Sequence, residues 1–439
     1  MKRRTCIGLA LSAMLVALGM TPGLTQGSQY SEDWAVISAN TTSPASAPWF
    51  RSKVDSPNDV GQHVSVAIDP DNGITYISYY DATYKDLRMA KYVGSGGNCG
   101  PNNDWSCETV DHGGDVGKYS SIAVDPTDNY PIIAYYDATN GALKLAIGSG
   151  GGWIIKTIHD PLLGAGSYAS LKLDSTGKTH IAYYFKQFYG NSLFYAEYVG
   201  GGAGNCTDND YQCDSIDSGD QVGKYASLAL DGSDRPRIAY YDGGNNALMY
   251  AKQNGGSWTI REILPANSGQ YASLYVDNGD IPHIAHLYNN GKLGYAVELE
   301  PGGNGNCGFN GGTMKMEWQC DEIDSMWPGL SLAVDASGYP IIAYQKGGSL
   351  KVARPAAALN LLHGNCGPQN LFYTWYCETI DPFQSLGPVV NGDFVSIDLN
   401  SSGLATIAYY SKFLVPSIGT LKVTYQRFQD FLPLVMKNQ

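Results

Sequence analysis

Residues Lys118 to Ala146 read KYSSIAVDPTDNYPIIAYYDATNGALKLA, and the stretch returns between Lys224 and Ala251 as KYASLALDGSDRPRIAYYDGGNNALMYA. Each copy contains three short runs rich in apolar and small residues, separated by turns that carry Asp, Gly or Pro. Such runs predict three β-strands of a meander. The chain is therefore a repeat array, and the rest of the sequence can be aligned to this copy.

Seven copies appear when the serine of each first strand is aligned. These serines are Ser65, Ser121, Ser170, Ser227, Ser273, Ser331 and Ser396. Four positions later an acid or amide stands in every copy: Asp69, Asp125, Asp174, Asp231, Asp277, Asp335 and Asn400. A side chain of this kind can hydrogen-bond the backbone of the turn that follows, so we expect it to brace the turn.

A fourth strand, marked by an aromatic residue some positions before Ile or Val, follows six of the copies but not the seventh. The same signature stands before the first copy, at Trp49 to Asp55. A ring of blades closes when the N-terminal strand completes the last blade. The sequence therefore predicts an all-β fold, a seven-bladed β-propeller of four-stranded antiparallel blades that spans residues 49–425.

The two ends differ from the repeats. Residues 1–27 combine Lys2, Arg3 and Arg4 with an apolar run and small residues, which is typical of a signal peptide. A Ser/Thr-rich linker, 28–48, follows it, and a tail, 426–439, resembles the Leu-Pro-Leu-Val tails of exported proteins from some filamentous bacteria. We expect a secreted or cell-surface protein with no membrane span after signal removal.

The net charge is −13 and is spread evenly along the chain. Because no basic stripe exists to displace phosphate counterions, nucleic acid is disfavoured as a partner. Solubility is a sufficient explanation of the acidic balance.

Eight cysteines follow the signal, and all of them fall between third and fourth strands. They form four local pairs: Cys99/Cys107, Cys206/Cys213, Cys307/Cys320 and Cys366/Cys377. Four disulfides in an oxidising compartment are predicted. Zinc is the competing interpretation, but the pairs lack C-x-x-C spacing and lie in four different blades.

One turn offers a candidate cation site. Asp69 and Asp71 place two carboxylates close together, as calcium loops do, but the other copies do not keep the second acid. A braced turn is the favoured interpretation, with calcium as the alternative. No other cofactor is predicted.

The repeat pattern resembles the seven-bladed propellers of secreted bacterial lectins and, more loosely, the sialidase-like superfamily. The lectin resemblance implies carbohydrate binding. The sialidase aspartate box, Ser-x-Asp-x-Gly-x-x-Trp, is absent from every copy, and the arginines fall at unrelated strand positions, which puts a carboxylate-binding arginine triad in doubt.

Two histidines suit a different class, a polysaccharide lyase. His63 stands where Tyr119 and Tyr225 stand in other copies, and His286 replaces the first Tyr of a Tyr-Tyr pair. A His near a Tyr can supply a base and an acid. Ordinary packing of the two histidines is the alternative.

A last pattern links three blades. The second strand ends in Tyr-Tyr-Asp in blades one, two and four, and Val-Gly precedes the first strand of the same blades. We expect these segments to meet on one face. Either each Asp is a brace, which accepts from the Val-Gly turn of its own blade or pairs with Lys118 or Lys224, or the segments form repeated shallow sugar sites. The candidate binding residues are Tyr80, Asp81, Lys118, Tyr136, Asp137, Lys224, Tyr241 and Asp242, together with His63 and His286.

Three functional hypotheses follow. The first is a secreted, multivalent, lectin-like protein that binds a glycan or a cell-surface component. The second is a carbohydrate-active enzyme, a lyase or glycosidase, and the third is a structural or adhesive component of the cell surface. Near-equivalent blades favour binding, since avidity needs only copies whereas catalysis needs one asymmetric cluster. The residues leave the sugar and the oligomeric state open.

Overall fold

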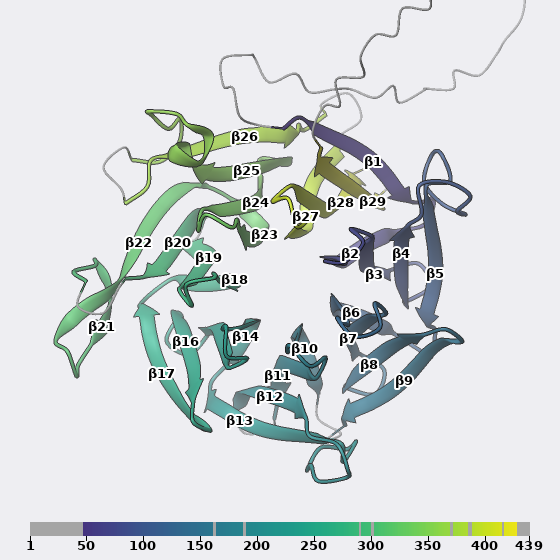
Figure 1. The fold of residues 1–439 in the computed structure, drawn as a ribbon, viewed down its shortest axis with the longest axis horizontal. Coiled ribbons are helices and arrows are strands. Elements are labelled where there is room, and N and C mark those ends of the chain that lie inside the picture. The colour runs from purple at the N-terminus through teal and green to yellow at the C-terminus, as the bar shows by residue number, and fades with distance from the viewer. Residues whose placement is uncertain are drawn as a thin grey trace, which may run out of the picture. The chain divides into compact units, whose positions relative to one another are not determined.

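Seven antiparallel sheets succeed one another around a common axis in the computed structural model (Figure 1). The structure describes residues 47–160, 164–187, 190–288, 291–299, 303–368, 372–384, 389–414 and 417–427. The predicted signal segment, nearly all of the linker and nearly all of the tail lie outside these residues. The predicted propeller is confirmed, and its blades are the repeats found in the sequence.

The first strand of each blade lies nearest the axis and the fourth lies at the rim (Figure 1). Blades one and two are β2(Val60–Ile68), β3(Thr75–Asp81), β4(Asp86–Tyr92), β5(Trp105–Asp111), β6(Val116–Val124), β7(Pro131–Asp137), β8(Ala142–Ser149) and β9(Gly152–His159). Blades three and four are β10(Ala165–Leu173), β11(Thr179–Lys186), β12(Asn191–Tyr198), β13(Tyr211–Gly219), β14(Val222–Leu230), β15(Pro236–Asp242), β16(Ala247–Asn254) and β17(Ser257–Leu264).

Blade five differs from the others by an added strand. It consists of β18(Ser268–Val276), β19(Pro282–Tyr288), β20(Lys292–Glu298), β21(Cys307–Asn310) and β22(Lys315–Ser325). Blade six is β23(Trp327–Val334), β24(Pro340–Lys346), β25(Ser349–Pro355) and β26(Trp375–Asp381), with one 3-10 turn at Ala356–Leu359. Within the described residues this turn is the one helical element, which fits strands rich in aromatic and β-branched residues.

The ring is closed by a strand from the other end of the chain. Blade seven contains β27(Val389–Leu399), β28(Ala405–Leu414) and β29(Ser417–Gln426), and β1(Trp49–Asp55) pairs antiparallel with β29 from Trp49↔Gln426 to Asp55↔Leu421. Trp49 is 4% exposed and Val54 is fully buried. The predicted displaced strand is therefore confirmed, and it covers the edge that β29 would otherwise expose.

The aligned serines form a continuous belt around the axis. Each serine Oγ accepts a hydrogen bond from a backbone N–H of the next blade, at 2.9 to 3.2 Å in all seven junctions. Ser396 of blade seven accepts from Val66 of blade one, which completes the circle. The axial edge of a first strand has no neighbouring strand to pair with. Its backbone N–H therefore needs another acceptor, which explains the serine in every copy.

The acid or amide four residues after each serine braces its turn, as predicted. Asp174, for example, accepts from the backbone N–H groups of Thr176 and Lys178 at 2.8 and 2.9 Å. Asp69 is fully buried and accepts from the backbone of Asp71 and from the Asn72 amide at 2.9 and 2.5 Å. The turn therefore uses the Asp69 carboxylate internally.

The apolar core lies between neighbouring sheets, and a polar clasp recurs at its edge. In five junctions an Asp at or near the end of a fourth strand accepts from the hydroxyl of a Tyr in the next blade. The pairs are Asp55–Tyr79, Asp111–Tyr135, Asp217–Tyr240, Asp324–Tyr344 and Asp381–Tyr409, at 2.6 to 2.8 Å. In a sixth junction His159 takes the place of the Asp against Tyr183, at 2.7 Å.

The seventh junction replaces both partners of the clasp at once. His286 stands at the Tyr position of blade five, and Leu264 stands at the Asp position of blade four, opposite Leu248 in the sheet. His286 is fully buried, and Gly294 leaves the space for its ring, because a Cβ there would lie 2.8 Å from the imidazole. His286 is thus part of a packed junction.

Four disulfides join the predicted pairs: Cys99–Cys107, Cys206–Cys213, Cys307–Cys320 and Cys366–Cys377. In each loop the Asn before the first cysteine binds the backbone of the second through its side chain, as Asn98 does with Cys107 at 2.7 Å. Each bridge therefore braces its own hairpin.

Peptide mapping without reduction should recover the four pairs within hairpins. Each bridge closes a short loop and is expected to contribute about 2 to 3 kcal/mol to stability by restraining the unfolded chain. A peptide that links cysteines of two different blades would contradict this assignment.

Candidate functional site

An aromatic ring surrounds the axis where the first strands begin. It consists of six residues, each two positions before its blade's serine, which we call the aromatic collar: His63, Tyr119, Tyr168, Tyr225, Tyr271 and Phe394. Neighbouring ring centroids lie 4.4 to 4.7 Å apart from Phe394 through His63 to Tyr271. The collar lines a cavity of about 490 Å³ that opens on one face of the propeller.

All six collar residues have left-handed backbone, with φ between 51° and 55°. Such angles are rare for bulky side chains and cost on the order of 1 to 3 kcal/mol each. They arise at a β-bulge, because the ladder between the first and second strands shifts register at this point. In blade one the register shifts between Val60 and Gln62 and again between Gln62 and Ser65. The bulge turns the collar side chain toward the cavity instead of into a sheet interface.

A second layer of aromatic residues supports the collar. In five blades the second Tyr of the Tyr-Tyr pair lies 6.0 to 6.3 Å, centroid to centroid, from the collar residue of its own blade. These tyrosines are Tyr80, Tyr136, Tyr184, Tyr241 and Tyr410. Three of them were predicted as binding residues, and the structure places them behind the collar.

The phenols of Tyr168 and Tyr225 remain protonated at neutral pH. Burial is the main cause that raises the pKa of Tyr168 and of Tyr225, and the hydroxyls of Tyr119, Tyr168, Tyr225 and Tyr271 interact in sequence. The site therefore combines apolar ring faces with a row of hydroxyl groups that can both donate and accept hydrogen bonds.

Asp81, Asp137 and Asp242 do lie beside the Val-Gly segments, since they pair with Val60, Val116 and Val222 in the ladders. They are only 0%, 1% and 6% exposed. Each accepts two backbone N–H groups of the hairpin turn that follows it, as Asp137 does from Thr139 and Asn140 at 3.0 Å. The braced segment is therefore the following hairpin and not the Val-Gly turn, because the acid sits at the first position of that hairpin.

The glycine of the Val-Gly segment has a packing role in six blades. At Gly61, Gly117, Gly166, Gly223 and Gly269 an added Cβ would lie 2.7 to 2.9 Å from the backbone of the preceding blade's third strand, or of β29 for Gly61. Gly392 is the sixth, and there the added Cβ would lie 3.2 Å from the Gln345 side chain. Close approach of backbones explains the other five glycines, so a glycine at this position is not specific to the three Tyr-Tyr-Asp blades.

The two predicted lysines lie at the rim of the collar. Lys118 donates to Asp115 at 2.7 Å and Lys224 to Gln221 at 2.6 Å, each within its own first-strand segment. Lys118 also lies 5.4 Å from the ring centroid of Tyr80. The lysines therefore do not pair with Asp137 and Asp242, because local acceptors satisfy them.

The two predicted histidines are separated by their environments. His63 belongs to the collar, and burial, together with the charge of Lys118, lowers its pKa to about 3. Burial lowers the pKa of His286 to about 4. Both are neutral at pH 7, and a group with so low a pKa is a weak general base.

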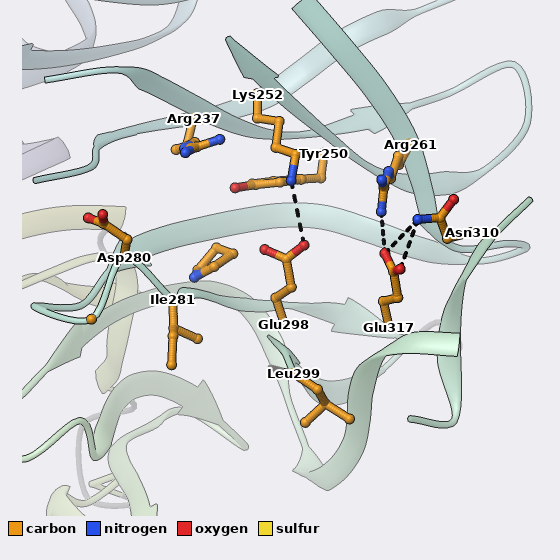
Figure 2. Close-up of a pocket in the computed structure, with 12 residues that line it drawn as sticks. Arg237, Tyr250, Lys252, Arg261, Asp280, Ile281, Glu298, Leu299, Asn310 and Glu317 are labelled. Carbon is orange, nitrogen blue, oxygen red and sulfur yellow. Dashed lines mark hydrogen bonds and ion pairs between the residues drawn. The ribbon is translucent and has the colours of Figure 1, made fainter. Parts of the chain in front are cut away.

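A second cavity, of about 350 Å³, lies between blades four and five on the side of the β18–β19 turn (Figure 2). Its charged residues face one another across the junction: Lys252 lies 3.8 Å from Glu298, and Arg261 lies 2.5 Å from Glu317. Asn310, at the end of β21, donates to both Glu317 oxygens at 2.8 Å. The Arg261–Glu317 pair holds the added hairpin of blade five against blade four, and the Lys252–Glu298 pair joins the third strands of the two blades.

Among the described residues no group of three or more His, Cys, Asp or Glu is placed to hold a metal ion. Within the same residues, no helix has the length and apolar character needed to cross a bilayer.

No family model matches the sequence, and no curated protein matches it. Solved structures are similar in fold. A polysaccharide lyase of family PL25, an ulvan lyase, is 14% identical with a TM-score of 0.47, over 84% of this chain and 93% of that chain. The polysaccharide lyase Uly1 is 9% identical with a TM-score of 0.43, over 92% and 94%. The intramolecular trans-sialidase from Ruminococcus gnavus is 12% identical with a TM-score of 0.37, over 83% and 93%.

The sequence singled out one collar residue, His63, and missed the collar as a unit. A signal was available, since the position two before the serine is aromatic in six copies and Gly329 in the other. What the sequence did not indicate is that a bulge turns this position toward the axis.

Proposed function

We propose that the protein is a secreted carbohydrate-binding protein whose ligand lies in the aromatic collar. The observation that carries the proposal is the collar itself: six partly buried rings at one repeat position, held in strained backbone around an open cavity. Apolar faces of sugar rings stack on aromatic side chains, and the tyrosine hydroxyls supply partners for sugar hydroxyls. Strain retained at six equivalent places is typical of a functional surface.

Binding is favoured over the enzymatic alternative by the surroundings of His63. Burial and the charge of Lys118 lower the pKa of this collar histidine to about 3, so it is a weak general base for a lyase at neutral pH. The four disulfides support secretion, because such bonds persist in oxidising compartments. The collar is one continuous site on the axis, so it replaces the repeated shallow sites expected from the three blade ends.

A glycan array with neutral and acidic oligosaccharides, run beside a polysaccharide degradation assay, tests the proposal. Tyr168→Gly should lower the affinity for any captured oligosaccharide by about 10-fold, the loss expected for one stacking ring. Its melting temperature should change little, since Gly relieves the left-handed strain while the ring contacts are lost. Tyr168→Ala should be less stable than Tyr168→Gly by about 1 kcal/mol, because Ala keeps that strain.

The matched control changes the three buried acids together. The variant Asp81→Asn, Asp137→Asn and Asp242→Asn leaves the collar intact, so binding should survive with a slightly lower melting temperature. If the triple variant loses binding while Tyr168→Gly keeps the affinity of the unmodified chain, the site lies at the three blade ends. Capture of no oligosaccharide at all, or degradation of a polysaccharide, would contradict the binding function.

A further inference from the structure

The aromatic collar is interrupted at blade six. Gly329 occupies the collar position there, with φ at 117°, and an added Cβ would lie 2.5 Å from the carbonyl oxygen of Gly392. No side chain fits at this point. Trp327, two residues earlier, lines the same cavity and is 53% exposed. The otherwise repetitive site thus has one distinct end, between blades six and seven.

A polar pair stands at this interruption. Gln345 takes the place of the second Tyr that supports the collar elsewhere, and its Nε2 donates to Asp393 Oδ1 at 2.9 Å. Gln345 is fully buried, and its Oε1 has no hydrogen-bond partner within the described part of the chain. Asp393 is half-buried and is the one acid among the described residues that line the cavity. Its carboxylate is therefore oriented by a buried amide at the mouth of the site.

We propose that Asp393 is the hydrogen-bonding anchor of the axial site, positioned by Gln345, and that the ligand is a neutral sugar. This inference rests on the proposed carbohydrate-binding function and adds to it the ligand class. A carboxylate accepts hydrogen bonds from sugar hydroxyls, and such charge-assisted bonds are stronger than neutral ones. The same charge repels uronate, sialate or sulfate groups. Trp327 beside the anchor offers a ring face to the sugar unit that Asp393 holds.

The surroundings of Asp393 give the anchor a pH signature. Burial raises the pKa of Asp393, and Lys412 opposes this effect. Tyr410 is its ladder partner on β28, Lys412 lies two residues further along the same strand, and Gln345 of β24 is neutral. His63 of β2 lines the same cavity and packs against the neighbouring Phe394. The carboxylate is the form that accepts hydrogen bonds, so affinity for the sugar should fall as the pH is lowered. Because the pKa of Asp393 is raised, the fall should begin at a pH above 3.8, the ordinary pKa of Asp. His63 titrates lower, near 3.

The test compares Asp393→Asn with the full chain, using neutral glucan, mannan, xylan and galactan hexasaccharides and an oligogalacturonate as probes. Asp393→Asn should lower affinity for the bound neutral hexasaccharide by at least about 10-fold, as expected for a hydrogen bond to a charged group. It should also abolish the acid dependence. Gln270→Asn, at the same strand position of blade five, is the matched control and should bind like the unmodified chain.

Gln345→Leu tests the positioning role separately. Removing the amide should weaken neutral binding and shift its pH midpoint, whereas a purely structural role would lower only the melting temperature. If Asp393→Asn keeps the affinity of the unmodified chain while Tyr168→Gly still binds more weakly, the anchor is overturned and the collar function stands. Oligogalacturonate binding as tight as neutral binding would overturn the ligand class. If no probe binds the unmodified chain, the proposed function fails together with the anchor.

Discussion

Removing residues 1–55 is expected to lower the melting temperature by more than about 10 °C or to cause aggregation, whereas removing residues 1–48 is expected to leave it unchanged. The two truncations differ only in β1. That strand buries Trp49 and Val54, and Asp55 accepts from the Tyr79 hydroxyl at 2.6 Å. Loss of a buried Trp by itself costs about 3 to 5 kcal/mol.

Loss of β1 also exposes an open edge at β29, and such an edge pairs readily with other chains. Thermal unfolding and light scattering on the two truncations measure both effects. Equal melting temperatures would mean that the ring does not depend on the N-terminal strand, and the closure described here would be wrong.

Asp381→Ala is expected to destabilise the protein by about 3 to 5 kcal/mol, the cost of removing one partner from a buried ionic cluster. Asp381 is fully buried at the end of β26 and joins three strands of the closing blade. It pairs with Arg51 of β1, lies 3.4 Å from Lys422 of β29, and accepts from the Tyr409 hydroxyl of β28 at 2.8 Å. The substitution removes the common acceptor of two cations.

The matched control is Asp217→Ala, at the same strand position of blade three. Asp217 is partly buried and accepts from the Tyr240 hydroxyl at 2.6 Å and from the Ser218 backbone N–H at 2.8 Å, and no ion pair with a lysine or arginine is found for it among the described residues. Its loss should cost only about 1 to 3 kcal/mol, the penalty for one unsatisfied hydrogen bond. Denaturant unfolding of both variants gives the comparison. A smaller effect at Asp381 than at Asp217 would show that the cations contribute nothing to closure.

The repeat pattern was sufficient to predict the blades, the displaced strand, the disulfides and the braced turns. These features depend on interactions that are local or repeated. Asp174 binds a turn that begins at the next residue, and Cys206 pairs with a cysteine of its own hairpin. The closure of the ring could be predicted as well. The last blade lacks a fourth strand of its own, and Trp49 to Asp55 is the one segment with the fourth-strand signature that belongs to no other blade.

Only the tertiary structure decided where the candidate site lies. The collar joins residues from six blades, and a bulge decides that each points to the axis, which strand alternation alone does not indicate. His286 looked distinctive in the sequence, yet its clasp partner is replaced by Leu264 in the neighbouring blade, and packing buries it. Gln345 and Asp393 are unremarkable in sequence and meet because blades six and seven are adjacent. Side chains from different blades are brought together by the radius and register of the ring, and no local pattern encodes those distances.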